Sequence, residues 1–332
     1  MKINFEKIEQ LVIDGYITKR KHPTEKLYIY NYSNKAQFEW LWNDETMLCR
    51  GLIVDENYNI ISRPFRKFFN IEQLEYKMPD CSYDVYCKLD GSLGISYKTG
   101  DSYAIATRGS FESLQALKAT KMLNKYNYKF EDGKTYLFEI IYPLNRIVVD
   151  YKDREELILL AIIDNETGED HELQDIGFET VGIFKAQPLE TLMKIQRKNE
   201  EGFVLKFVNG DRIKIKMDEY KRLHKLLTGV SEKRVWENLK EGSVNELLEN
   251  VPDEFHKWCK GVIGKITLEY RNIERLCQKD YRDLGNRKQT AMYYKTCKYS
   301  AILFRMLDGK DYSGIIWKLV KPTGEEVFKR IV

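Results

Sequence analysis

From residue 27 to about residue 217 the hydrophobic positions fall in short runs that Gly, Asn and Asp separate. Val, Ile, Phe and Tyr dominate these runs, which is typical of β-strands. Residues 111–127 and 188–199 instead repeat their apolar positions at three- and four-residue spacing, which predicts helices. This part of the chain is therefore predicted to be a sheet-based body of mixed α and β structure. Its β-rich runs are LYIYNYS, MLCRGLIVD, DVYCKLD, LGISYK, YAIATR, TYLFEIIY, LILLAII, GFVLKFV and RIKIKM.

After residue 217 the pattern changes to longer stretches with helical spacing, in which Ser231 and Asp253 stand where helix N-caps are expected. No flexible or low-complexity linker marks the change. We therefore predict two domains, residues 1–222 and residues 223–332, of which the second is all-helical.

Charge is distributed unevenly between these two parts. Residues 1–220 contain 31 Lys and Arg against 36 Asp and Glu, a net charge of −5, whereas residues 221–332 contain 23 against 15, a net charge of +8. A basic excess in one domain is what a polyanion binder needs, although an ordinary solvated surface can have it too.

Several classes of protein are disfavoured by what the sequence lacks. No hydrophobic stretch approaches the roughly 18 to 20 residues that cross a bilayer, and the chain begins without the apolar core of a signal peptide. The six cysteines and four histidines show no zinc-type spacing, and GKT at residues 133–135 lacks the first glycine of a P-loop. We expect a cytoplasmic protein without a membrane partner, in the host cytoplasm if a phage encodes it.

Lys88 is the first candidate for chemistry, because the segment YCKLDGSLGISY places it where a β-rich run ends and a glycine-containing turn begins. A lysine amine attacks only when it is neutral, so a nucleophilic lysine needs burial or neighbouring cations. The motif K-x-D-G alone is weak evidence, because an ordinary lysine beside a hairpin turn has the same pattern.

A second candidate lies in GFVLKFVNGDRIKIKM, where Asn209-Gly210 between two alternating runs predicts a hairpin with a two-residue loop. That loop pairs Leu205 with Lys214 and Phe203 with Lys216. It would put Glu201, Phe203, Leu205, Lys214 and Lys216 on one face, and Val204, Ile213 and Ile215 on the other. An acid with two lysines suits phosphates and a metal ion, although a solvated amphipathic strand is an alternative interpretation.

Further upstream, cations and aromatic residues mix in the predicted hairpin of residues 47–70, as they do in nucleotide sites. Its two aromatic residues, Phe68 and Phe69, could equally be part of the hydrophobic core instead of a nucleotide site. Arg108 follows a β-rich run, and Glu139 stands among apolar neighbours, where a carboxyl group needs a partner or a ligand.

These motifs occur in a fixed order: K-L-D-G at Lys88, T-R-G-S at Thr107, F-E at Phe138, E-G-F-V-L-K at Glu201 and K-I-K at Lys214. The ordered set resembles the superfamily of covalent nucleotidyltransferases, and R-G-L-I-V-D, S-R-P-F-R-K-F-F-N, P-L-N-R-I-V and K-I-K-M-D-E-Y resemble its phage RNA ligase 1 family. The resemblance implies an α+β fold, with an antiparallel-sheet nucleotidyltransferase domain (ATP-grasp-like ligase) followed by an all-helical C-terminal domain. The helical tail distinguishes it from DNA ligases and capping enzymes, which usually continue into a β-rich OB-fold.

The resemblance also implies the roles of individual residues. Lys88 would form a covalent lysyl-AMP, assisted by Lys214 and Lys216 at the α-phosphate, and Glu201 would help to bind Mg²⁺, with Mn²⁺ as the alternative metal. Glu139 would contact the ribose. The other nucleotide-binding residues would be Arg50, Lys67 and Arg108 along phosphates, Phe69 and Tyr220 near the adenosine, and Cys87 and Gly91 beside Lys88.

The resulting prediction is an ATP-dependent RNA ligase that joins 5′-phosphate and 3′-hydroxyl RNA ends, single-stranded or from a broken tRNA, in RNA repair. The basic tail would bind the RNA, and a separate kinase and phosphatase would heal the ends. Two alternatives stay open: a nick-sealing ligase or capping-type guanylyltransferase on the same body, and a non-catalytic RNA-binding protein that has kept the fold.

Overall fold

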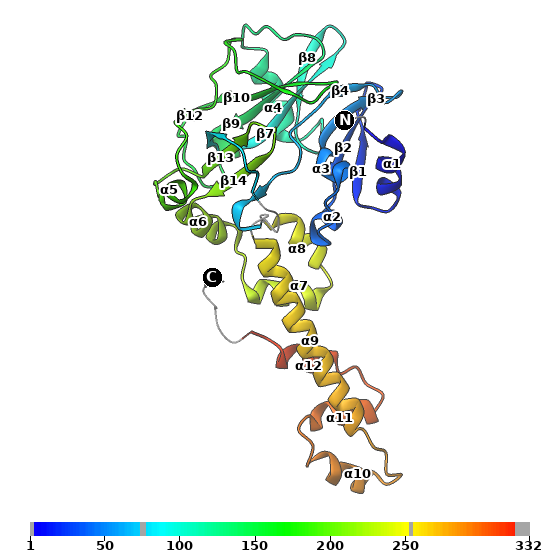
Figure 1. Cartoon of the computed structure of the whole chain (residues 1–332). Coiled ribbons are helices and arrows are strands. Elements are labelled where there is room, and N and C mark those ends of the chain that lie inside the picture. Colours follow the sequence, from blue (N-terminus) through cyan, green and yellow to red (C-terminus); the bar gives the residue numbers. More distant parts are fainter. Residues whose placement is uncertain (1–2, 74–77, 252–254, 323–332) are drawn as a thin grey trace. The chain divides into compact units, whose positions relative to one another are not determined.

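The computed structural model describes residues 3–73, 78–251 and 255–322. The chain divides into two compact units, Met1–Leu227 and Thr228–Val332, which Figure 1 colours from blue to green and from yellow to red. The first unit holds all fourteen strands that occur among the described residues, arranged in three sheets. Among these residues, no helix combines the length and the apolar character that a membrane crossing requires.

Sheet 1 is antiparallel and has the order β1 (Ile17–Lys21), β2 (Leu27–Tyr32), β3 (Arg50–Asp55) and β4 (Ile60–Ser62). The predicted hairpin of residues 47–70 is present as β3 and β4, although Met47 and Leu48 belong to the preceding helix. Three helices accompany this sheet in the chain: α1 (Phe5–Ile13), α2 (Asn34–Phe38) and α3 (Asp44–Leu48). Ile8 and Leu11 of α1 are buried against the sheet in one apolar cluster.

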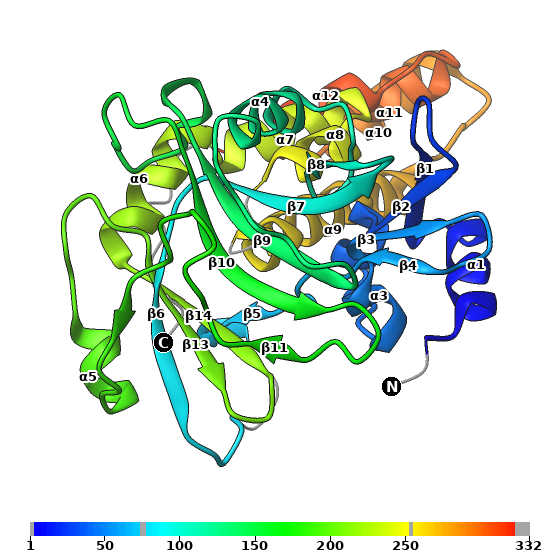
Figure 2. The same cartoon turned by 90° about the horizontal axis from the view of Figure 1, so that it is seen from above.

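Sheet 2 is also antiparallel, and Figure 2 shows several of its long strands side by side. Its order is β11 (Asp170–His171), β10 (Glu156–Asp164), β9 (Lys134–Ile141), β7 (Ser92–Thr99) and β8 (Ser102–Ala106). Helix α4 (Leu114–Leu123), with Ser113 as its N-cap, buries Ala119 and Met122 against Phe138. A second cluster joins Leu137 to Ile29 and Ile53 of sheet 1.

Sheet 3 has the order β12 (Ile183–Phe184), β6 (Tyr83–Lys88), β13 (Gly202–Phe207), β14 (Arg212–Lys216) and β5 (Phe69–Asn70). All its pairs are antiparallel except that between β14 and β5. Three elements adjoin its strands in the chain: η1 (Ile71–Gln73), α5 (Leu189–Lys194) and α6 (Asp218–Thr228). A further short element, η2 (Pro143–Asn145), follows β9 of sheet 2. Helix α5 covers half of the predicted helical stretch 188–199, and Pro188 is its N-cap residue.

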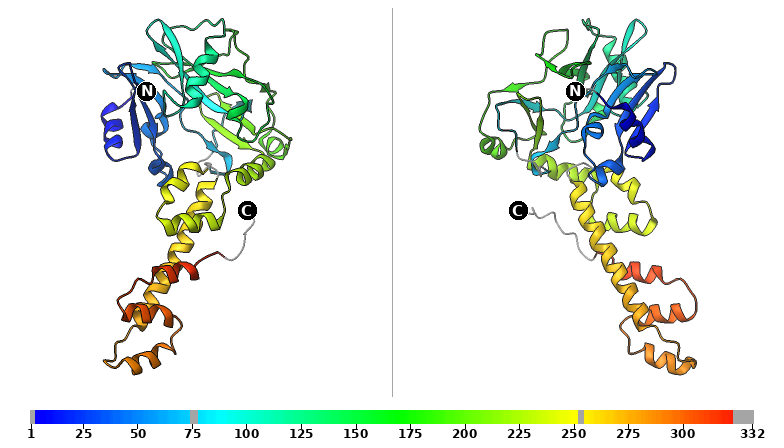
Figure 3. Two further views of the ribbon diagram at one scale, coloured as in Figure 1. Left: turned by 180° about the vertical axis from the view of Figure 1, so that it is seen from behind. Right: turned by 45° about the vertical axis from the view of Figure 1, so that its right-hand side comes forward.

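The second unit contains only helices within its described residues. Its longest helix is α9 (His256–Asp280), and Figure 3 shows this gold helix with the orange and red helices along its C-terminal half. Ser231 caps the first helix of this unit by accepting a hydrogen bond from the backbone N–H of Arg234, as predicted, whereas Asp253 lies outside the described residues. The other helices are α7 (Glu232–Glu241), α8 (Val244–Asn250), α10 (Arg287–Tyr294), α11 (Ser300–Leu307) and α12 (Ser313–Leu319).

The mixed α+β architecture with antiparallel sheets is thus confirmed, but the predicted register of the β13–β14 hairpin is wrong by one residue. The loop has three residues instead of two, because Phe207 pairs with Asp211 and Gly210 takes a left-handed φ of 89°. A type I turn followed by a left-handed glycine is the other common hairpin connection that Asn-Gly supports. As a result, Val204 pairs with Lys214, and Gly202 pairs with Lys216.

The corrected register changes which side chains share a face. Phe203, Leu205, Ile213 and Ile215 are buried together in the core of sheet 3, so the predicted grouping of Phe203 and Leu205 with the lysines is wrong. The opposite face carries Val204, Lys206, Arg212, Lys214 and Lys216.

Candidate active site

Lys88 ends strand β6 and lies beside Gly202, which in turn lies beside Lys216 of β14. Its amine donates a hydrogen bond to Glu201 Oε2 at 2.8 Å, and the Lys216 amine approaches Glu201 Oε1 at 3.1 Å. The exposed fractions of the three side chains are 20% for Lys88, 4% for Glu201 and 8% for Lys216. Burial alone would raise the pKa of Glu201, but the two ammonium groups hold that pKa below its ordinary value. The site therefore contains a buried carboxylate shared by two lysines.

In a regular strand the alternation of side chains would direct Glu201 to the core face, together with Phe203. Gly202 interrupts this alternation and allows Glu201 to reach the lysines. Gly202 has a φ of 149°, in the region that favours glycine, and a Cβ there would lie 1.9 Å from the carbonyl oxygen of Ile215. The backbone of Glu201 is fixed by the hydrogen bond that its carbonyl accepts from Met217 N at 2.9 Å. Glu201 thus joins the lysines through a glycine turn at the strand start.

A cleft of about 530 Å³ extends from Lys88 between sheets 2 and 3 of the first unit. Sheet 3 contributes Cys87, Lys88 and Val204 to its lining, whereas Glu139 comes from sheet 2. Its other lining residues are Arg50, Phe65, Phe68, Asp84, Tyr86, Leu89, Gly91, Leu93, Leu160, Ala161, Asp170, His171, Glu172, Leu173, Val181, Ile183, Lys206 and Arg212. A concave space in which apolar side chains surround a few placed polar groups is typical of a small-molecule site.

Gly91 brings the turn after Lys88 into close contact with strand β9. A Cβ at position 91 would lie 2.6 Å from the carbonyl oxygen of Ile140 and 3.2 Å from Glu139 Oε1. Any larger residue would therefore push the Lys88 turn away from Glu139.

Glu139 is the most strongly perturbed carboxyl group of the cleft. Loss of solvent, aided by the negative charges of Glu201 and Asp90, raises the pKa of Glu139 to about 8, although Lys88 and the N–H of Gly91 act in the opposite direction. Near neutral pH the side chain is therefore mostly a neutral carboxyl, which can donate a hydrogen bond as well as accept one.

This perturbation predicts a pH-dependent stability. Between about pH 4.5 and pH 8 the unfolded chain gives up the Glu139 proton while the folded chain keeps it, so the contribution of Glu139 to folding falls as pH rises. Glu139→Gln cannot ionise and should remove this part of the slope. Denaturant unfolding of both proteins at pH 5, 6, 7 and 8 measures it. A difference in the free energy of unfolding that stays constant across this range would contradict the prediction.

Arg108 and Lys67 converge on Tyr32, a residue that the sequence motifs did not single out. Arg108 Nη1 donates to the Tyr32 hydroxyl at 2.6 Å, and Lys67 Nζ lies 3.5 Å from the same oxygen. Lys67 also lies 5.2 Å from the ring centroids of Tyr32 and Trp42 and 5.5 Å from that of Phe69. Two cations and three aromatic rings therefore form one cluster.

Of the remaining residues predicted to bind the nucleotide, some line the cleft and others do not. Arg50 lines the cleft, with its guanidinium 5.5 Å from the ring centroid of Phe68. Phe69 and Tyr220 are not among the lining residues: Phe69 packs against Trp40 and Trp42, and the buried Tyr220 donates its hydroxyl to Asp90 at 2.7 Å. Lys214 and Lys216 share one side of β14, and neither lines the cleft. The other predicted site residues outside the lining are Lys67, Arg108 and Glu201.

The protein side chains that could bind a metal ion near Lys88 are few. Over the described residues, no group of three or more His, Cys, Asp or Glu side chains is arranged to hold a metal ion. Both carboxylate oxygens of Glu201, the predicted metal ligand, are in contact with the amines of Lys88 and Lys216.

Residues 48–220 match the family model described as RNA ligase, that of the phage RNA ligase 1 family. Because the match covers slightly more than half of the chain, the protein belongs to this family, and the resemblance seen in the motifs is confirmed. The matched range contains every residue to which the motifs assigned a role.

Two relatives show how far this similarity extends. A protein of Autographa californica nuclear polyhedrosis virus named "Putative bifunctional polynucleotide kinase/RNA ligase" is 30% identical over 249 residues, 64% of this chain and 35% of the relative. A "Putative RNA ligase" of Thermovibrio ammonificans is 28% identical over 193 residues, 51% of this chain and 50% of the relative. The chain thus spans half or less of these relatives.

Solved structures resemble the chain more weakly. A Naegleria gruberi RNA ligase with pyrophosphate has a TM-score of 0.32 and 18% identity over 43% of this chain and 51% of its own. A "Putative ATP-dependent DNA ligase" from Aquifex aeolicus has a TM-score of 0.44 and 13% identity over 93% of this chain and 100% of its own.

Proposed function

We propose that this protein is an ATP-dependent RNA ligase in which Lys88 is the covalent nucleophile. The observation that carries the proposal is the grouping of Lys88 with Glu201 and Lys216, in which Lys88 itself lines a cleft of about 530 Å³. Membership of the RNA ligase family supports the same reaction.

In the first step the neutral Lys88 amine attacks the α-phosphorus of ATP. A nitrogen–phosphorus bond forms, the bond to the bridging oxygen of pyrophosphate breaks, and the amine gives up one proton. On the neighbouring strand β14, Lys216 contacts Glu201. Lys214 lies two residues before Lys216 on the same face of that strand. Both stabilise the negative charge that develops on the transferring phosphate. Mg²⁺ or Mn²⁺ bound by Glu201 would neutralise charge on the phosphates.

The next two steps use the lysyl-AMP that the first step leaves on the chain. An oxygen of the RNA 5′-phosphate attacks the phosphorus and releases Lys88, so that AMP is now joined to the RNA end. The 3′-hydroxyl of a second RNA end then attacks the 5′-phosphate, which forms a phosphodiester and releases AMP.

Glu139 and Gly91 would hold the nucleoside in this reaction. The carboxyl group of Glu139 faces the cleft beside Lys88, and its raised pKa keeps it able to donate a hydrogen bond to a ribose oxygen near neutral pH. Arg50 and Phe68 supply a cation and a ring at the cleft wall.

Labelled ATP tests the proposal directly. With Mg²⁺, a label on the α-phosphate should remain on the denatured protein, whereas a label on the γ-phosphate should not. Addition of RNA with a 5′-phosphate and a 3′-hydroxyl end should then remove the label from the protein, and sealed RNA should form. Retention of label from GTP instead of ATP would favour a capping-type enzyme, and RNA binding without any retained label would favour a non-catalytic protein.

We further propose that the helical unit binds the RNA, such as the broken tRNA of a repair reaction in which a separate kinase and phosphatase prepare the ends. The whole unit, residues 228–332, contains 20 Lys and Arg against 15 Asp and Glu. The excess is concentrated in residues 256–322, which contain 15 Lys and Arg against 6 Asp and Glu, a net charge of +9. Lys288, Lys295 and Lys298 of this stretch are exposed. Such a surface would attract phosphates without reading the base sequence.

The combined variant Lys288→Glu, Lys295→Glu and Lys298→Glu should weaken RNA binding and flatten its salt dependence by about one unit of slope for each phosphate that the protein no longer neutralises. Filter binding of a nicked tRNA at several salt concentrations measures the effect. The control makes the same charge change at Lys121, Lys125 and Lys129, which are exposed in the first unit. An equal loss of affinity in both variants would mean that the helical unit has no special role. Retention of α-label from ATP should be unchanged in both.

A further inference from the structure

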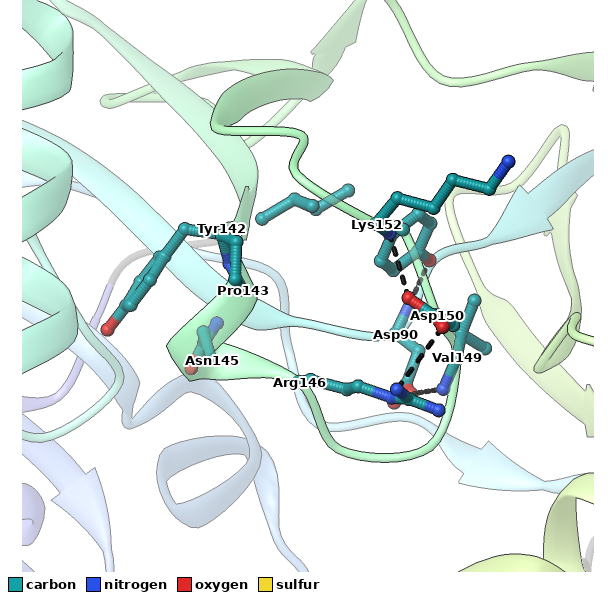
Figure 4. A pocket seen from close by; sticks show the side chains of 10 residues that line it. Asp90, Tyr142, Pro143, Asn145, Arg146, Val149, Asp150 and Lys152 are labelled. Atoms are coloured by element: carbon teal, nitrogen blue, oxygen red, sulfur yellow. Dashed lines mark hydrogen bonds and ion pairs between the residues drawn. The ribbon is translucent and has the colours of Figure 1, made fainter.

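Residues 148–152 follow η2 and lie against the turn that begins at Lys88. The carboxylate of Asp90 accepts hydrogen bonds from the backbone N–H groups of Val148 at 2.8 Å and Val149 at 2.7 Å. The backbone N–H of Asp90 donates to the hydroxyl oxygen of Tyr151 at 2.8 Å. Figure 4 shows the contacts of Asp90 with this segment around a small pocket. Because Asp90 is only two residues from Lys88, the segment fixes the Lys88 turn by three hydrogen bonds.

The same segment is tied to the chain that carries Glu201. The backbone N–H of Asp150 donates to Asn199 Oδ1 at 2.7 Å, and Asn199 Nδ2 donates to the carbonyl oxygen of Asp150 at 2.9 Å. Asn199 is two residues before Glu201. Its amide therefore pairs with the backbone of one residue of the segment through two hydrogen bonds, as two strands pair in a sheet.

Two strained residues mark this contact. Asn199 has a φ of 61° and Lys152 a φ of 57°, both in the left-handed region that costs free energy for residues other than glycine. The Asp150 carboxylate supports the turn locally, since it accepts the Lys152 N–H at 2.8 Å and forms an ion pair with Arg146 at 3.3 Å. The surrounding hydrogen bonds therefore hold a conformation that the chain would not choose by itself.

On the basis of the proposed function, we propose that Asn199 and Tyr151 are positioning residues for the adenylylation of Lys88. The amine of Lys88 and the carboxylate of Glu201 meet at 2.8 Å although the residues are 113 positions apart in the sequence. Residues 148–152 bind the turns beside both of them, at Asp90 and at Asn199. The segment thereby sets the distance and angle between the nucleophile and its carboxylate. Neither residue lines the cleft, so both act on the rate of the chemical step more than on ATP binding.

Single-turnover transfer of α-label from ATP to the full-length protein tests this role. Asn199→Ala and Tyr151→Phe should each lower the rate at saturating ATP about tenfold, because small misplacements of reacting groups are costly. The Kd of ATP should change less than about twofold. Asn199→Gly keeps the left-handed backbone accessible but removes the amide, so it should be as slow as Asn199→Ala.

The control is Asn209→Ala at the other end of β13. Asn209 also makes turn hydrogen bonds, to Asp211, but far along the strand from Lys88. Its loss should leave the rate unchanged. The double variant Asn199→Ala, Tyr151→Phe should be slowed by less than the product of the two single reductions in rate. The reason is that both substitutions disturb the same alignment of Lys88 and Glu201.

Three results would overturn the proposal: wild-type rates in Asn199→Gly, an equal slowing in Asn209→Ala, or a rise in the Kd of ATP that accounts for the whole effect. A wild-type protein that retains no α-label at all would instead reject the proposed function. Melting temperatures of all variants distinguish a folding defect from a slower step, and Tyr151→Phe tests the Lys88 side if the Asn199 variants are unstable.

Discussion

Lys88→Ala is expected to reduce the α-label that ATP leaves on the denatured protein to background, with RNA sealing lost in parallel. The alanine has no amine to form the nitrogen–phosphorus bond, and Lys216, the other lysine at Glu201, belongs to a different strand, β14. Electrophoresis of the denatured protein after reaction with labelled ATP and Mg²⁺ measures this result.

The variant Lys88→Arg separates the charge of Lys88 from its nucleophilicity. Arginine keeps a cation opposite Glu201 but remains protonated in proteins, so it should also retain no label. Its melting temperature should stay nearer to that of the wild type than the melting temperature of Lys88→Ala, because the carboxylate keeps a partner. Label on either variant would show that another residue is the nucleophile.

Glu201→Gln should affect both stability and chemistry. Two ammonium groups contact this carboxylate, and a neutral amide leaves them without a compensating charge in a largely buried place. Breaking a buried ion pair in this way costs about 3 kcal/mol. Adenylylation should fall to a small fraction of the wild-type rate, since Glu201 orients Lys88 and is the proposed ligand of the metal ion.

The loss of stability should itself depend on pH. The pKa of Glu201 lies below its ordinary value in the folded protein, so its contribution is present at neutral pH and is lost as the pH falls through that lowered pKa. The wild type and Glu201→Gln should therefore converge in stability in acid. Denaturant unfolding at neutral pH and at a series of successively lower pH values checks this, with the native content measured first at each pH.

Glu200→Gln is the matched control for Glu201→Gln. Glu200 is the preceding residue and forms an ion pair with Arg197 at 3.3 Å, in which the side chains are 34% and 42% exposed. Such a pair contributes about 1 kcal/mol or less. If Glu200→Gln were as destabilising as Glu201→Gln, the shared carboxylate between the two lysines would not be the cause.

Some features of the site follow from local sequence alone. The alternation in DVYCKLD and RIKIKM predicts strands, and the structure has β6 and β14 there. The order of the motifs identified the RNA ligase family, and the match of residues 48–220 to the model of that family confirmed it. The hairpin register could not be derived in the same way, because Asn-Gly supports both two-residue and three-residue loops, and only the packing of Phe203, Leu205 and Ile213 in the core selects between them.

The sequence by itself thus determined the strand pattern of the first unit and the family of the protein, and it predicted helices after residue 217. Only the tertiary structure decided that Glu201 meets Lys88 and Lys216, through the φ of Gly202, and that residues 148–152 connect Asp90 to Asn199. The physical reason is that strand propensity and alternation act between neighbours in the chain, whereas an ion pair across 113 residues and a backbone held in a strained turn depend on the packing of segments that are distant in sequence.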